Sequence, residues 1–511
     1  MRLRRWLSAV LLSICTAPAA HAAFQPDLSA LDELPLHAAP AEVLAKSIAR
    51  DRQHKGGGPQ RFAAIAPLPL SLADGVWDEP AAGTSRWRLR VYSAGAKALM
   101  MEFGQLVLPA TAQLRIYDVA GKTVQGPYRA ENLPASGRLW TAMVPGEMAV
   151  IELLLPSAQR AGAALGLARV AHAWRDPRDV QDIGASSACE INVACPLGNA
   201  WRNQIRSVVK LQIPVGDSVG SCTGTLVNNF AEDAKPYVLT AHHCEIRAAN
   251  AGDVVVYWNF QNSSCEGAAD ASDTQNISGT SVIALSQAHD MALLRVSSKP
   301  PAAYNAFYAG FDASNSAVSD GVGIHHPAGD VKKISEFTAE PEQGPANVDG
   351  GYEDVPAWIV TWSQGVTEPG SSGSALWNQD KLVVGVLSGG ASDCADTTLT
   401  DSYARIDQQW LGGGTAGSQL KAWLDPANSG NRRLLGKNAS ALGATPTPAP
   451  TATPTAAPTA TPVPTIAPTA TPEPTETPDP DDEGGGGGAS SPLALTLLGL
   501  VALLRRRRPI H

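Results

Sequence analysis

The chain has 511 residues, which is too long for one ordinary domain and predicts two or three folded units with accessory segments. Its formal net charge of -9 argues against a nucleic-acid partner. Only 17% of the residues are charged, whereas Gly and Pro number 47 and 39, so we expect a strand-rich and loop-rich protein rather than a helical one.

Residues 1–22 have the pattern of an export signal. Arginines near the start precede an apolar run, 6–15, that is too short to cross a bilayer. Ala20-His21-Ala22 has the small-x-small pattern that signal peptidase recognises, and we place cleavage after Ala22. Signal peptidase is therefore an expected partner; the alternative is a short membrane anchor.

Removal of this signal leaves six cysteines. An even number in an oxidising compartment predicts three disulfides, and every pairing stays open at this point. The chain has no C-x-x-C pair, so we expect no metal site and no other cofactor. The six residues are Cys189, Cys195, Cys222, Cys244, Cys265 and Cys394.

Residues 23–183 contain no cysteine and no group that suggests chemistry. Short apolar segments, 87–92, 113–117 and 150–154, alternate with Gly and Pro turns, as in a small β-sandwich. We interpret this region as a β-rich propeptide or accessory domain.

Residues 184–437 carry all six cysteines. Strand-like runs recur at 207–211, 237–240, 254–258 and 382–387, which suits a pair of antiparallel β-barrels. Gln419–Asp425 is expected to form a short closing helix. The predicted fold class of the whole chain is therefore all-β.

Residues 438–483 are expected to form a stalk. From Ala444 to Pro480 the composition is mostly Thr, Pro and Ala, and the hexapeptide APTATP occurs at 449–454, 457–462 and 467–472. Proline at this density prevents a packed core and favours polyproline conformation, with a reach on the order of 100 Å.

Residues 484–511 begin with five glycines and continue with an apolar run, 492–504, and four arginines, 505–508. With the glycines the segment is long enough to cross a bilayer, the arginines staying in the cytoplasm. It resembles the GlyGly-CTERM sorting tail of Gram-negative bacteria, which implies a rhomboid-like peptidase as a partner. The implied location is secreted or cell-surface, after a transient inner-membrane anchor; a permanent anchor is the alternative.

Three short segments carry the chemistry. They are Thr240-Ala241-His242-His243-Cys244, Asp290-Met291-Ala292-Leu293-Leu294 and Gly370-Ser371-Ser372-Gly373-Ser374-Ala375. Each alone has an ordinary structural explanation: a core histidine, a strand-end cap and a flexible turn. Their order, His then Asp then Ser, is that of chymotrypsin-like serine proteases.

Each residue type in this set has a defined task. Ser372 needs a base to become a nucleophile, and His243 can accept and return a proton near neutral pH. Asp290 would hold the tautomer of His243. The backbone N–H groups of Gly370 and Ser372 are expected to form an oxyanion hole.

The region from residue 184 to about 430 resembles the bacterial lysyl endopeptidases, a branch of the chymotrypsin-like proteases. The resemblance implies a two-barrel fold and the disulfides Cys189–Cys394, Cys195–Cys265 and Cys222–Cys244. It is carried by Cys189-x5-Cys195-Pro196, CTGTLVNN at 222–229, TAHHC at 240–244, VYWN at 256–259, GIHHPAGDVK at 323–332, GVTEPGSSGS at 365–374 and WLDP at 423–426.

The primary specificity depends on fewer residues. Val366 occupies the position at which trypsin has its specificity carboxylate, six residues before the nucleophile. Lysyl endopeptidases instead have an aspartate before an S/Q-Y-x-R motif, which corresponds here to Asp401. Asp393 is a rival, and Asp401 as a solvated turn residue is the alternative.

Two departures from the family concern specificity and activation. Ser388 stands where family members carry a histidine, so preference for Lys over Arg stays open. No lysine precedes Gly184, the position of the family's mature terminus, so Arg175 and Arg178 are better candidates for self-cleavage.

The leading hypothesis is a secreted serine endopeptidase that cleaves protein or peptide substrates after Lys, with Arg as a second possibility. One alternative is a serine protease of different primary specificity. Another is a catalytically inactive surface adhesin that binds through its N-terminal region.

Overall fold

The computed structural model describes residues 24–53, 58–134, 136–175, 186–266, 270–348, 352–396 and 398–443. All of them lie in one compact unit, Met1–Thr447. The predicted signal, Arg178, Gly184, the stalk repeats and the C-terminal tail lie outside the described residues. Within the described ranges, no helix is both long enough and apolar enough to cross a membrane.

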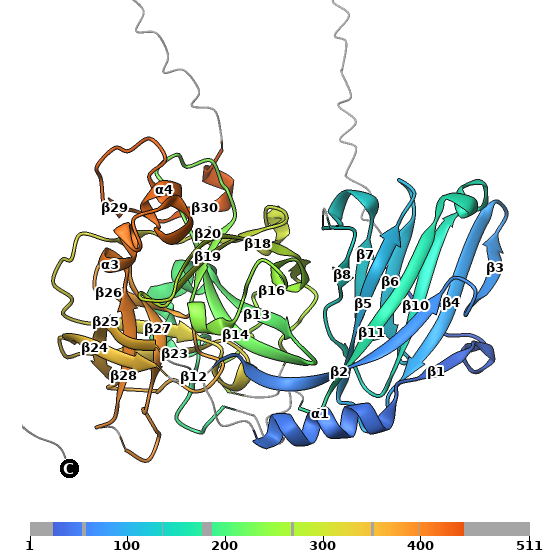
Figure 1. The fold of residues 1–511 in the computed structure, drawn as a ribbon, viewed down its shortest axis with the longest axis horizontal. Coiled ribbons are helices and arrows are strands. Elements are labelled where there is room, and N and C mark those ends of the chain that lie inside the picture. The colour runs from blue at the N-terminus through green and yellow to red at the C-terminus, as the bar shows by residue number, and fades with distance from the viewer. Residues whose placement is uncertain are drawn as a thin grey trace, which may run out of the picture. The chain divides into compact units, whose positions relative to one another are not determined.

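The N-terminal region is a sandwich of two β-sheets. The first sheet has the order β1-β4-β10-β6-β7, with β3 also on β4, and Figure 1 shows β4, β10 and β6 side by side. The second sheet brings β2, β11, β5 and β8 together, with β9 on β5. The strands are β1 (Leu36–Ala38), β2 (Gln60–Ser71), β3 (Val76–Ala81), β4 (Thr84–Tyr92), β5 (Ala98–Val107), β6 (Gln113–Asp118), β7 (Val124–Tyr128), β8 (Leu139–Trp140), β9 (Val144–Pro145), β10 (Met148–Pro156) and β11 (Ala164–Ala173).

Strand β4 shows why the sandwich forms. Its side chains alternate between two faces, so Trp87, Leu89 and Val91 enter the core that both sheets share. The intervening arginines face the opposite side, where Arg86 forms ion pairs with Asp27 and Asp78. The expected sandwich is confirmed.

The second sheet of the sandwich continues into the first barrel, because β2 pairs antiparallel with β14. One hydrophobic cluster spans this junction and contains Phe62 and Trp140 from the sandwich and Val219, Tyr257 and Phe260 from the barrel. The barrel strands are β13 (Val208–Val215), β14 (Ser218–Val227), β15 (Tyr237–Thr240), β16 (Val255–Trp258), β17 (Asn276–Ser278), β18 (Thr280–Ser286) and β19 (Met291–Val296).

The second barrel is built on a sheet with the order β12-β23-β22-β26-β27-β28-β25-β24. Its core is continuous with that of the first barrel, since Val209 and Leu239 belong to one cluster with Ile324, Trp377 and Val386. The strands are β12 (Ile191–Asn192), β20 (Phe307–Tyr308), β21 (Phe311–Asp312), β22 (Gly321–His325), β23 (Lys333–Phe337), β24 (Glu342–Val348), β25 (Tyr352–Thr361), β26 (Ala375–Asn378), β27 (Val383–Gly390), β28 (Thr400–Arg405), β29 (Arg433–Leu434) and β30 (Lys437–Asn438).

The described helices are α1 (Ala41–Gln53) in the N-terminal region, and the short α2 (Arg202–Ile205), α3 (Ile406–Leu411) and α4 (Lys421–Leu424). The closing helix expected over 419–425 is thus a single turn. Folded structure also continues past residue 437, where we expected the stalk to begin. Strand β30 pairs with β20, and Leu442 belongs to the main hydrophobic cluster.

Three disulfides join cysteines of the described ranges, with the pairing that the resemblance implies: Cys189–Cys394, Cys195–Cys265 and Cys222–Cys244. Cys222 lies on β14, and Cys244 ends the short 3₁₀ turn His242–Cys244. This bond ties the segment that carries His243 to the first barrel.

Candidate active site

His243 is held by a buried strand on one side and a disulfide on the other. Strand β15 ends at Thr240, and the following turn carries His243 directly before Cys244. The side chain of His243 is 4% exposed. Because both flanks are fixed in the first barrel, the imidazole has little freedom to move.

Asp290 lies in the turn between β18 and β19, with a left-handed φ of 41°. Its carboxylate accepts two hydrogen bonds from His243: the backbone N–H donates to Oδ1 at 2.9 Å, and Nδ1 lies 2.8 Å from Oδ2. A carboxylate is an acceptor, so Nδ1 carries the proton and Nε2 is left free to accept one. Burial alone would raise the pKa of Asp290, but its interaction with His243 holds it below its ordinary value.

Ser372 lies in a tight turn after Gly370, whose φ is 102°, and before Gly373, whose φ is 82°. The turn is docked on β14, because Thr223 N–H donates to Ser372 O at 2.8 Å and Thr223 Oγ1 donates to Gly370 O at 3.0 Å. A Cβ on Gly373 would overlap Thr240 Oγ1, so the turn also packs closely on β15. Only glycine meets both demands at this position.

Two backbone donors in this turn are free. Among the described residues, the N–H groups of Gly370 and Ser372 have no hydrogen-bond partner. Their neighbours are bonded, since Ser371 N–H donates to Glu368 O at 2.9 Å and Gly373 N–H donates to Leu387 O at 2.9 Å.

His243 and Ser372 both line one cavity of about 900 Å³. Two segments of the second barrel, 366–369 and 387–394, form part of its wall. Val366 and Ser388 are among the wall residues and are 4% and 1% exposed. His243 and Ser372 therefore face a space large enough for a peptide side chain.

Asp401 does not line this cavity itself; it lies on β28 behind residues that do. Its Oδ2 accepts hydrogen bonds from Trp362 Nε1 at 2.6 Å, Thr367 Oγ1 at 2.7 Å and Ser392 Oγ at 2.7 Å. Burial raises the pKa of Asp401, and these hydrogen bonds oppose that shift. The rival Asp393 does line the cavity, but it is an exposed turn residue.

Sequence reasoning missed several residues of this site. Gly58–Arg61 and Trp174–Arg175, all from the N-terminal region, also line the cavity. They come there because β2 pairs with β14 and β11 pairs with β2. No local sequence motif predicts such long-range strand pairing.

Within the described part of the chain, no group of three or more His, Cys, Asp or Glu side chains is arranged to hold a metal ion.

Comparison with known proteins assigns the family. The model of the lysyl endopeptidase N-terminal domain matches residues 30–174, and that of the lysyl endopeptidase C-terminal domain matches residues 183–404. The chain belongs to the lysyl endopeptidase family. It is 28% identical over 470 residues to the lysyl endopeptidase of Pseudomonas aeruginosa, covering 79% of this chain and 96% of that protein. It is a serine endopeptidase.

Two solved proteases are also similar. The active form of the Rv3671c protease from M. tuberculosis is 21% identical, with a TM-score of 0.31, covering 45% of this chain and 91% of that one. An HtrA-type protease solved with a tripeptide is 15% identical, with a TM-score of 0.31, covering 43% of this chain and 65% of that one.

Proposed function

We propose that this serine endopeptidase cleaves protein substrates after Lys, and also after Arg, through a triad of Ser372, His243 and Asp290. The observation that carries the triad is the pair of hydrogen bonds from His243 to Asp290, with His243 and Ser372 facing one cavity. Nε2 of His243 accepts the Ser372 proton as Oγ attacks the scissile carbonyl, and then returns it to the leaving amine. Water, activated in the same way, hydrolyses the acyl-enzyme.

The N–H groups of Gly370 and Ser372 stabilise the oxyanion of each tetrahedral intermediate. Their freedom from other partners supports this role, because an oxyanion hole needs donors that are preorganised and unused in the ground state. The left-handed φ of Gly370 and its docking on Thr223 support a fixed geometry before substrate arrives.

Asp401 gives the preference for basic side chains. No Lys or Arg lies within ion-pair distance of its carboxylate among the described residues, so its negative charge lacks a cationic partner. Thr367 and Ser392 both bind Asp401 and line the cavity, so they connect the buried charge to the substrate. A substrate ammonium or guanidinium would supply the missing charge.

The N-terminal region acts as a propeptide. It shares a hydrophobic cluster with the first barrel, and its residues Gly58–Arg61 and Trp174–Arg175 narrow the cavity that contains His243 and Ser372. Substrate would compete with these residues, so the uncut chain is a zymogen. Activation by cleavage after Arg175 fits the position of this residue, and Arg178 is the other candidate.

The export signal and the C-terminal tail give the location. Signal peptidase removes residues 1–22, the tail holds the enzyme at the inner membrane, and a rhomboid-like peptidase releases it to the surface or the medium. The family assignment supports export, since the matched relative is a lysyl endopeptidase.

Digestion of denatured casein, followed by mass spectrometry of the products, tests the specificity. Lys, with a minority of Arg, is expected before each cut. Asp401→Asn should lower kcat/KM on Lys peptides by orders of magnitude, but leave labelling by a small fluorophosphonate unchanged. Asp312→Asn is the matched control, because Asp312 is also buried and its carboxylate accepts hydrogen bonds from Ser314.

Cuts after apolar or acidic residues would support the alternative of a different primary specificity. An unchanged Lys preference in Asp401→Asn would move the role to Asp393.

A further inference from the structure

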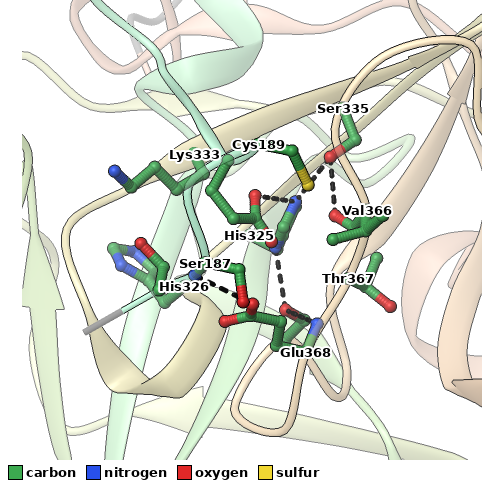
Figure 2. A network of polar contacts seen from close by, with 12 residues as sticks. Ser187, Cys189, His325, His326, Lys333, Ser335, Val366, Thr367 and Glu368 are labelled. Carbon is green, nitrogen blue, oxygen red and sulfur yellow. Dashed lines mark hydrogen bonds and ion pairs between the residues drawn. The ribbon is translucent and has the colours of Figure 1, made fainter. Parts of the chain in front are cut away.

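Directly behind the nucleophile lies a buried Ser–His pair that the triad does not use. His325 is the last residue of β22, and Ser371 precedes Ser372 in the chain. Both side chains are 0% exposed, and His325 Nδ1 lies 2.8 Å from Ser371 Oγ. Figure 2 shows His325 between Ser335 and the loop that carries Glu368.

The direction of each hydrogen bond around His325 follows from the number of protons available. Ser335 Oγ donates its single proton to Val366 O at 2.7 Å, so it accepts from His325 Nε2 at 3.1 Å. Nδ1 of a neutral imidazole then has no proton and accepts from Ser371 Oγ. Ser371 Oγ in turn accepts from Glu368 N–H at 3.1 Å.

This chain of bonds needs His325 to be neutral. Burial, assisted by the charge of Lys333, lowers the pKa of His325 to about 3. Glu190 Oε2 lies 3.8 Å from Nε2, but burial, with repulsion from Glu368, raises the pKa of Glu190 well above its usual value. The neighbouring His326 is neutral as well, because burial lowers its pKa. Glu190 also lies beyond hydrogen-bond distance of the imidazole, so Ser335 and Ser371 are its hydrogen-bond partners.

These hydrogen bonds hold one loop at three points: the carbonyl of Val366, the N–H of Glu368 and the hydroxyl of Ser371. The same loop carries Gly370 directly before Ser371 and Ser372 directly after it, and it forms one wall of the cavity. Because β22 and β23 are paired strands of the second barrel, His325 connects the loop to a rigid sheet.

We propose that neutral His325 is a positioning residue, which holds the two oxyanion-hole donors in place by accepting a hydrogen bond from Ser371. The proposal rests on the function proposed above for Ser372 and Gly370. A displacement of about 1 Å in a catalytic group can lower the rate by about 10²-fold. The loss falls on kcat, because an oxyanion hole acts on the transition state rather than on bound substrate.

The test compares four variants, each prepared and activated as the full chain in the same way as the wild type. Ser371→Ala removes the donor, and His325→Leu removes the acceptor. His325→Asn restores an acceptor, because its amide oxygen can occupy the place of Nδ1. Ser207→Ala is the control. Ser207 is as buried as Ser371, and the substitution likewise removes one hydroxyl, which donates to Gln204 O.

Ser371→Ala and His325→Leu should lower kcat for a Lys peptide amide by about 10²-fold, with KM changed less than about 3-fold. His325→Asn should recover about 10-fold relative to His325→Leu. Ser207→Ala should match the wild type. Thermal unfolding is recorded for each variant, and Ser371→Ala, which deletes one hydroxyl, measures the same link if His325→Leu does not fold.

Wild-type kcat in folded Ser371→Ala would overturn the proposal, as would equal activity of the Leu and Asn variants at position 325. Ser372→Ala, measured in parallel, distinguishes a failure of the proposed function from a failure of the positioning role. If Ser372→Ala keeps its activity, the proposed function itself fails; if it is inactive while Ser371→Ala is normal, only the positioning role fails.

Discussion

Replacing Asp290 by Asn tests the geometry around His243 with almost no change in volume. In the unchanged protein, one carboxylate oxygen of Asp290 accepts from the backbone N–H of His243 at 2.9 Å, and the other lies 2.8 Å from Nδ1. An amide has a single acceptor oxygen. The backbone N–H of His243 can only donate, so the amide oxygen of the new Asn is expected to remain its acceptor. The NH₂ group then faces Nδ1.

Two donors cannot face each other, so the imidazole proton moves from Nδ1 to Nε2. In this tautomer Nε2 cannot accept the proton of Ser372, and kcat should fall by about 10⁴-fold. The variant also loses a hydrogen bond to a charged group, worth about 1.5–3 kcal/mol, but it no longer buries a charge, so the fold should persist.

The assay measures kcat on a Lys peptide amide, together with thermal unfolding, for Asp290→Asn and for the control Asp312→Asn. The control should keep wild-type kcat. If folded Asp290→Asn lost less than about 10-fold in kcat, Asp290 would not hold the tautomer of His243, and the proposed triad would be wrong.

Three further predictions concern stability and location. Replacing Cys222 and Cys244 together by Ser should lower the free energy of unfolding by about 3 kcal/mol, because the bond closes a loop with a sequence separation of 22; denaturant unfolding that did not change would contradict this. Burial lowers the pKa values of His325 and His326 below the ordinary value of 6.5, so their stabilising contribution is complete above about pH 6.5 and is lost as the pH falls toward the folded-state values. Urea unfolding should therefore show lower stability at pH 4.5 than at pH 7.5, with a smaller difference in His325→Asn, and an equal difference in that variant would refute the assignment to His325. Deleting Leu493–His511 should send the enzyme to the periplasm or medium without a membrane-bound form, whereas secreted enzyme that kept its C-terminal arginines would favour a permanent anchor.

Local pattern was sufficient to predict most strands. The segment expected at 113–117 is β6 (Gln113–Asp118), and that at 237–240 is β15 (Tyr237–Thr240), because alternating or continuous apolar side chains reflect which faces are buried. The end of the folded region was harder to predict. Strand β30 has two residues and forms only because β20, far away in sequence, provides its partner.

The candidate site divides in the same way. His243, Asp290 and Ser372 are predicted as catalytic residues because each lies in a short motif, whereas the disulfide pairing follows from the resemblance rather than from spacing. The surroundings of Asp401 were not found, because Trp362 is 39 positions away and is brought there by the pairing of β25 with β28. Trp174 likewise lines the cavity only because the N-terminal region packs against the barrels, and no local sequence pattern predicts that contact.

Covalent labelling with a fluorophosphonate, with the modified residue located by mass spectrometry, tests whether Ser372 is the nucleophile. The activated wild-type enzyme should carry the label on Ser372 alone. Ser372→Ala should carry none, and His243→Ala should react far more slowly, because the serine then lacks its base. A label on another residue, or undiminished labelling of Ser372→Ala, would contradict the assignment of the nucleophile.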